Sequence, residues 1–101
     1  MLDFLKDAGI DSLVIEDLKR TYDRNNLYTL YTNEYEAVKI IKYFREIGID
    51  YIEELLVYNF RVFIYSLDEV KKAFEKYGVK TCVDKINEDY YVIDKILLGK
   101  L

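Results

Sequence analysis

Histidine, tryptophan and proline are absent from this chain of 101 residues, and cysteine occurs once, as Cys82. Without histidine there is no imidazole metal ligand and no His–Asp proton relay, and one cysteine cannot form a thiolate zinc site or an internal disulfide. The glycines, Gly9, Gly48, Gly78 and Gly99, lie too far apart to form a phosphate-binding loop. The sequence therefore predicts no catalytic residue, no cofactor and no metal ligand, and it favours a protein that is not an enzyme.

Long hydrophobic runs are also missing, since no apolar segment approaches the ~20 residues that a membrane-spanning helix needs. The opening residues, MLDFLKDAGID, mix acidic with apolar side chains and lack the basic and then apolar order of a secretory signal. A lone cysteine without an export signal is typical of a reducing compartment. We therefore expect a cytoplasmic protein that makes no membrane contact.

Positive charge is in deficit, because 15 Lys and Arg residues stand against 19 Asp and Glu residues, for a net charge of −4. This balance disfavours a general phosphate-neutralising surface, although a local basic patch stays open. Hydrophobic residues make up 51% and charged residues 34% of the chain, which is typical of a globular protein. The length predicts one domain, covering residues 1–101.

Apolar residues at helical spacing predict five main helices, within an expected total of five to seven. Their expected ranges are 12–22, 33–47, 51–58, 67–77 and 88–98. Thr32 is a candidate N-cap for the second of these helices, as Asp50 is for the third. Ser66 and Glu69 match the S-x-x-E capping box before the fourth helix.

Three segments share one plan, namely FLKDAGID, YFREIGID and AFEKYGVK at 4–11, 43–50 and 73–80. Each contains Phe and then Gly at a helix end, followed by Ile or Val and a residue that can cap the next helix. The recurrence of this plan along the chain indicates stacked helical units. The plan also gives Phe44 and Phe74 equivalent places in the core.

Two further segments, NLYTLYT at 26–32 and NFRVFIYS at 59–66, each connect one predicted helix to the next. They form either short helical turns or, at 27–31 and 60–65, two strands that pair with each other. We favour helical turns, which gives an all-α, irregular helical-repeat domain of the α-solenoid type. The alternative is an α+β domain with a small two-stranded hairpin.

The stretch YFREIGIDYIEELLVYNFRVFIYSLDEVKKAFEKYGV resembles the helical repeat of the mitochondrial transcription termination factor family. The positions that carry the resemblance are Phe44, Gly48, Ile49, Leu55, Leu56, Phe63, Tyr65, Ser66, Val70, Phe74 and Gly78. The chain departs from that repeat near Asn59, where the family usually has proline. The resemblance implies a stacked helical architecture and, as a second possibility, a concave surface that binds nucleic acid.

Basic and aromatic side chains supply the candidates for nucleic-acid contact. The basic candidates are Lys39, Lys42, Arg45, Lys71, Lys72 and Lys76. We expect these to form solvated helix surface instead. The tyrosines could stack on bases, but we expect Tyr35, Tyr51, Tyr58, Tyr65 and Tyr77 to pack at the edge of the core.

The predicted helix 88–98 carries the clearest candidate interface. With Ile93 facing the core, Tyr91 and Leu98 fall on the opposite face, and Leu101 lies just beyond them. We therefore expect a non-enzymatic interaction module that binds another protein, or a second copy of itself as a dimer. The alternative function is that of a helical-repeat protein that binds nucleic acid through the basic residues.

Overall fold

The segment 59–66 is a helical turn and not a strand. A computed structural model describes residues 1–101, and in it Phe60–Ile64 form the 3₁₀ helix η1. The other segment in question, 27–31, lies inside an α-helix, α3 (Arg24–Thr32). These two segments do pack against each other, but as helices, so the α+β hairpin alternative is wrong.

Eight α-helices and two 3₁₀ helices make up the fold, one α-helix more than the upper limit of the sequence prediction. In chain order they are α1 (Asp3–Asp7), α2 (Ser12–Thr21), α3 (Arg24–Thr32), α4 (Glu34–Ile47), α5 (Ile52–Tyr58), η1 (Phe60–Ile64), α6 (Leu67–Tyr77), α7 (Val79–Glu88), η2 (Tyr90–Val92) and α8 (Ile93–Leu97). The predicted helices 12–22, 33–47, 51–58 and 67–77 are confirmed to within one residue at each end.

The predicted helix 88–98 is wrong as a single element. Asp89 has extended backbone angles, φ −152° and ψ 100°, and therefore separates α7 from η2. Its carboxylate accepts a hydrogen bond from the Tyr91 backbone N–H at 3.2 Å, which starts the 3₁₀ turn. The short helix α8 follows from Ile93 and ends at Leu97.

Two of the predicted helix caps also need correction. Thr32 is the last residue of α3 and cannot cap α4, whose N-cap is Asn33. Asp50 makes no side-chain cap, and its backbone N–H instead donates to the Asn87 side chain at 3.0 Å. The capping box of Ser66 and Glu69 is present as predicted.

The glycine plan holds at two of its three positions in local geometry. Gly9 and Gly48 have positive φ, and in each case the next residue, Ile10 or Ile49, is buried and bonds to a carbonyl five residues earlier. This is the Schellman arrangement, which requires the left-handed conformation that glycine adopts without strain. Gly78 differs, with ψ 125°, and leads directly into α7. The helical repeat itself stays a prediction.

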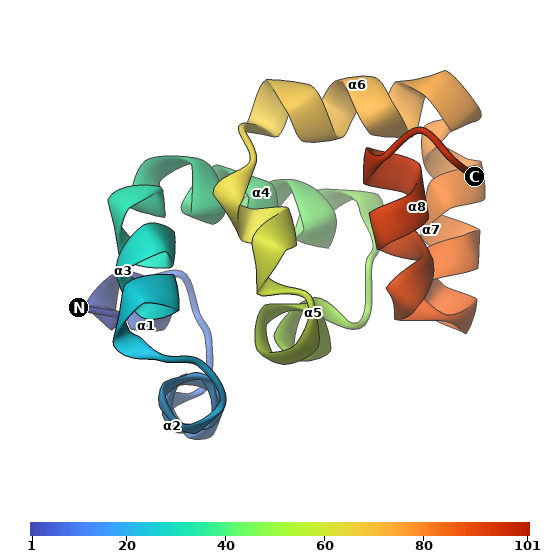
Figure 1. Ribbon diagram of the computed structural model, residues 1–101. Coiled ribbons are helices and arrows are strands. Elements are labelled where there is room, and N and C mark those ends of the chain that lie inside the picture. The colour runs from blue at the N-terminus through green and yellow to red at the C-terminus, as the bar shows by residue number, and fades with distance from the viewer.

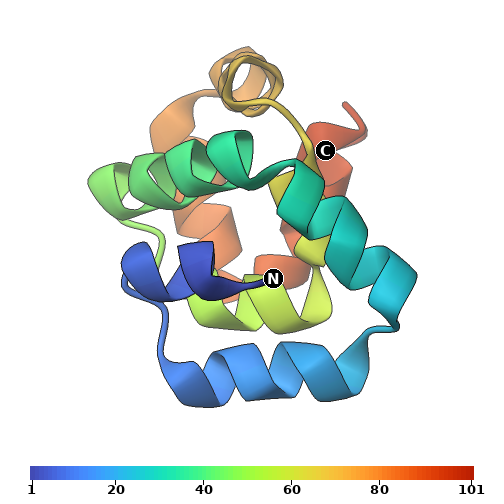
Figure 2. The ribbon, with the colours of Figure 1, turned by 90° about the vertical axis from the view of Figure 1, so that its left-hand side faces the viewer.

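Figure 1 shows the chain running from α1–α3 on one side, through α4 and α5, to α6–α8 on the other, so that the termini lie at opposite ends. The longest dimension of the molecule is 34 Å. Helices α2 and α5 lie side by side, as Figure 2 makes clear. The Tyr22 hydroxyl at the end of α2 donates to the carbonyl of Val57 in α5, which ties these two helices together.

One apolar core runs through the whole chain, because 25 buried residues from Leu2 to Ile96 form a single cluster. At its centre lie three fully buried rings, from α4, η1 and α6: Phe44, Phe63 and Phe74. The Phe44 and Phe74 rings stack with centroids 5.8 Å apart and planes 17° apart. Phe63 meets Phe44 edge-on, also at 5.8 Å. Phe44 and Phe74, which the sequence predicts at equivalent places in the core, thus stack on each other.

Polar bonds between distant segments fix the position of α6. The Glu36 carboxylate on α4 accepts a hydrogen bond from the Leu67 backbone N–H, the first residue of α6, at 2.9 Å. This bond, and then the contact with Lys39, lowers the pKa of Glu36. The Asn33 amide donates to the carbonyls of Phe63 and Tyr65 at 2.8 and 3.0 Å, so the turn before α6 is held to the start of α4.

Candidate functional site

Four tyrosines gather on the surface where α5 meets η2, and we call them the tyrosine cluster: Tyr51, Tyr58, Tyr90 and Tyr91. Tyr58 is 59% exposed and Tyr91 is 54% exposed, although both make aromatic contacts. The cluster therefore presents a large aromatic surface to solvent while its rings order one another. Tyrosine is among the residue types enriched in protein interfaces.

Helix α5 places three members of this surface on one face. Glu54 follows Tyr51, the N-cap of α5, by three positions, and Tyr58 follows Glu54 by four, so the three side chains lie along one side of the helix. The opposite stripe of α5 is apolar, and Leu55 and Leu56 are fully buried. Burial of that stripe turns the two tyrosines and the carboxylate outward.

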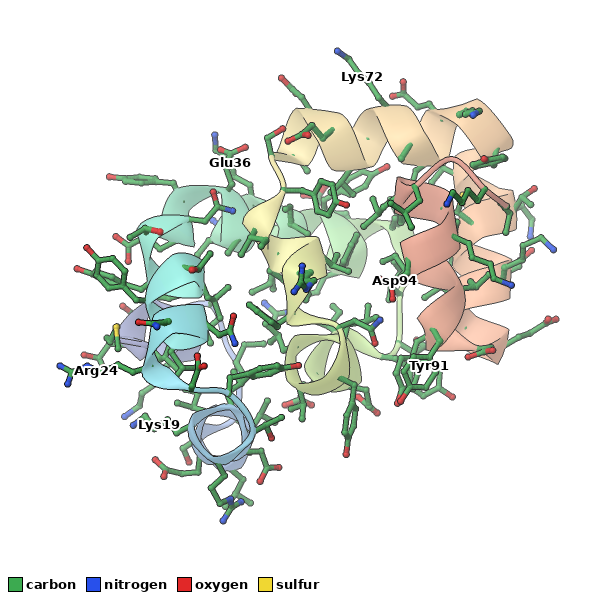
Figure 3. The ribbon with its side chains drawn as sticks, viewed as in Figure 1. Lys19, Arg24, Glu36, Lys72, Tyr91 and Asp94 are labelled. Carbon is green, nitrogen blue, oxygen red and sulfur yellow. The ribbon has the colours of Figure 1, made fainter.

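The turn η2 brings the other two tyrosines against this stripe. The centroid of the half-buried Tyr90 ring lies 4.5 Å from that of Tyr91, 5.7 Å from that of Tyr51 and 6.5 Å from that of Tyr58. The three interplanar angles lie between 27° and 37°, so the rings approach a parallel stack. Figure 3 shows Tyr91 at the end of α8 that is nearer to α5.

The electrostatic surroundings of the cluster are acidic. A hydrogen bond with Tyr91, then burial, then the phenol of Tyr58 and the Glu54 carboxylate raise the pKa of Tyr90 to about 12. Asp89 caps the turn that carries Tyr91. Neither Glu54 nor Asp89 takes part in any of the four ion pairs of the structure. These carboxylates are therefore not held in ion pairs within the chain, although the basic residue Arg61 lines a cavity with Tyr58 and Asp94.

A part-buried hydrogen bond links the residue after Tyr58 to α8. Asn59, next to Tyr58, is the one polar residue in the core, and its amide Nδ2 donates to Asp94 at 2.8 Å. The Asp94 side chain lies on the side of α8 that faces η1 (Figure 3). The bond joins the end of α5 to α8, and it thereby fixes Tyr58 relative to the turn that carries Tyr90 and Tyr91.

Sequence reasoning missed this cluster as a unit. The expectation of tyrosines at the core edge fits Tyr65 and Tyr77, which are half-buried. It does not fit Tyr58, nor Tyr35, which is 81% exposed. The missing signal was long-range, because Tyr51 and Tyr58 meet Tyr90 only through the packing of α5 against the C-terminal part of the chain.

The three residues predicted as an interface lie in different places. Tyr91 belongs to the tyrosine cluster, whereas Leu98 follows α8 at its other end and is 61% exposed. The backbone N–H of Leu101 donates to the Tyr77 hydroxyl of α6 at 3.3 Å. The continuous ridge expected for Tyr91 and Leu98 depended on the unbroken helix 88–98, so that geometric argument no longer holds.

Half of the predicted basic group comes together between α4 and α6. Lys39, Lys42 and Lys71 line a cavity of about 260 Å³ there. Two of these lysines already have partners: Lys39 pairs with Glu36 at 3.1 Å, and the Lys71 ammonium lies 5.4 Å from the centroid of the Tyr43 ring. This surface therefore carries less free positive charge than the sequence suggests.

The other basic candidates point elsewhere. Lys72 projects from α6 away from the rest of the molecule (Figure 3). The Arg45 guanidinium donates to the backbone carbonyl of Ala8, at the end of α1. The Lys76 ammonium lies 5.3 Å from the centroid of the Tyr77 ring. The six basic residues thus do not form one phosphate-binding surface.

No three Cys, Asp or Glu side chains lie together in a way that could hold a metal ion. None of the helices combines the length and the apolar character that crossing a membrane requires. Comparison with models of protein families, with curated proteins and with solved structures found no match. The resemblance to the mitochondrial transcription termination factor repeat therefore stays a prediction.

Proposed function

We propose that this chain is a non-enzymatic helical module that binds another protein, or a second copy of itself, through the tyrosine cluster. The observation that carries the proposal is the contact of four tyrosine rings on a surface where two of them are more than half exposed. Ordered aromatic rings that lose little conformational freedom on binding are typical anchors of protein interfaces.

The tyrosines on α3 and α4 do not form a comparable surface. Tyr28 and Tyr31 have centroids 6.1 Å apart, and Tyr35 has no aromatic neighbour. Tyr35 lies beside Glu34 but stacks on no ring. Tyr28 and Tyr35, which are 58% and 81% exposed, therefore supply controls of the same chemistry outside the cluster.

The test compares the wild-type chain with Tyr58→Ser/Tyr91→Ser and with the control Tyr28→Ser/Tyr35→Ser. Each protein is measured for self-association by sedimentation, and for proteins retained from an extract of the source cells by quantitative mass spectrometry. We expect only the cluster variant to lose a dimer or a set of retained proteins. All three proteins should keep the same helical circular dichroism.

Two results would contradict the proposal. In the first, the cluster variant and the control behave alike in both assays. In the second, the wild-type chain binds DNA or RNA with a steep dependence on salt, and Lys39→Ala/Lys42→Ala/Lys71→Ala abolishes that binding. The second result would favour the nucleic-acid alternative.

A further inference from the structure

The tyrosine cluster combines exposed aromatic rings with two carboxylates that form no ion pair within the chain. Glu54 lies between Tyr51 and Tyr58 on the same stripe of α5, and Asp89 lies at the start of the turn that carries Tyr91. Every ion pair in the molecule lies elsewhere. A cation brought to this surface would meet aromatic faces and carboxylates together.

Resting on the function proposed above, we infer that the partner is a basic peptide segment whose arginine side chains stack on Tyr58 and Tyr91 and pair with Glu54. A guanidinium is planar and stacks on aromatic faces, and it can donate two parallel hydrogen bonds to a carboxylate. The near-parallel rings of the cluster suit such a flat cation better than a compact ammonium. The net charge of −4 attracts a basic segment over a longer range.

The same charges argue against the two other occupants. In a two-fold contact between copies of the chain, Glu54 and Asp89 of one copy would face the same carboxylates of the other, and like charges would approach each other. Nucleic-acid bases could stack on the rings, but their phosphates would then lie near Glu54 and Asp89. A basic peptide is the occupant whose charge complements the surface.

The test titrates the full chain with three capped peptides of equal length, in which arginine, lysine or glutamine alternates with glycine. Binding is followed by calorimetry and by the NMR signals of the tyrosine rings. We expect the arginine peptide to bind and to shift the ring signals of Tyr58, Tyr90 and Tyr91. The lysine peptide should bind more weakly than the arginine peptide, by a factor of about three or more, and the glutamine peptide should not bind.

Matched variants locate the binding. Tyr58→Leu and Tyr91→Leu keep apolar bulk but remove the aromatic face, so each should weaken the arginine peptide about fivefold to tenfold. Glu54→Gln should weaken it by a similar factor and reduce its dependence on salt. Tyr35→Leu, on a tyrosine outside the cluster that is 81% exposed, should leave binding unchanged, and circular dichroism should be the same for all variants.

Equal binding of the arginine and glutamine peptides, or arginine binding that Tyr58→Leu and Tyr91→Leu do not change, overturns the inference. So does a single-stranded oligonucleotide that shifts the same ring signals more strongly than the arginine peptide. If the arginine peptide fails while Tyr58→Ser/Tyr91→Ser still abolishes partner capture, the surface is an interface for a partner of other chemistry. If both experiments fail, the proposed function fails with the inference.

Discussion

Charged side chains have partners on the surface between α4 and α6 but form no ion pair on the surface between α5 and η2. On the first, Lys39 is paired with Glu36, and Lys71 lies over the Tyr43 ring. On the second, the Glu54 and Asp89 carboxylates take part in no ion pair. The difference teaches that the number of charges in a sequence says little about binding. What matters is which charges the fold leaves without a partner.

The largest expected effect concerns the core beneath the α4–α6 surface. Phe44→Ala or Phe74→Ala should each lower the free energy of unfolding by about 3–5 kcal/mol, because each removes a fully buried ring from the stacked pair. Chemical denaturation measures the loss. Tyr35→Ala, at an 81% exposed position, should change stability by no more than about 0.5 kcal/mol.

A loss below about 1 kcal/mol in either phenylalanine variant would mean that the core can close over the missing ring. In that case the equivalent core places predicted for Phe44 and Phe74 would be wrong. The expected loss is a large part of the roughly 5–15 kcal/mol that stabilises a typical domain.

An intermediate effect is expected behind the α5–η2 surface. Asp94→Ala should lower the free energy of unfolding by about 1–3 kcal/mol, because the Asn59 amide would be left buried without its acceptor. Asp84→Ala provides the matched control, since Asp84 makes only an exposed ion pair with Lys80. Equal stability of the two variants in denaturant would show that the Asn59–Asp94 bond does not hold the surface together.

The smallest expected effect on stability appears only at alkaline pH. Tyr90 should titrate at about 12 instead of its ordinary 10.0, and this component of the near-ultraviolet phenolate signal should disappear in Tyr90→Phe. Because the folded state binds this proton more tightly, its contribution to stability is complete below pH 10.0 and is lost as the pH rises towards 12.

Tyr91→Phe sharpens the same measurement. The hydrogen bond with Tyr91 is the largest cause of the raised Tyr90 pKa, so its removal should bring the Tyr90 titration down towards the ordinary value. An unchanged titration in Tyr91→Phe would mean that the two hydroxyls do not interact in solution, and that the rings of the cluster are less ordered than the structure shows.

Local signals in the sequence predicted most of the fold. The apolar stripe of Ala37, Ile40, Ile41 and Phe44 repeats at helical spacing, and these four residues are fully buried in α4. The capping box at Ser66 depends only on residues of the same turn, and it was predicted correctly for that reason. Such features need no knowledge of the rest of the chain.

The errors arose where distant segments decide the local structure. Asn33, and not Thr32, is the N-cap of α4, and its side chain bonds to carbonyls about thirty residues later. Helix 88–98 is the exception: its apolar residues keep helical spacing, but Asp89 has an extended backbone and its carboxylate caps the turn two residues later. The tyrosine cluster could not be found from local signals, since only tertiary packing brings α5 to η2.

The lone cysteine makes the opening of this protein measurable by thiol labelling. Cys82 is fully buried in α7, its thiol lies 3.6 Å from the Phe74 carbonyl, and burial raises its pKa. A thiol reagent can therefore reach it only in molecules in which local or global opening exposes α7. The rate of labelling under native conditions reports how readily this opening occurs, without any introduced residue.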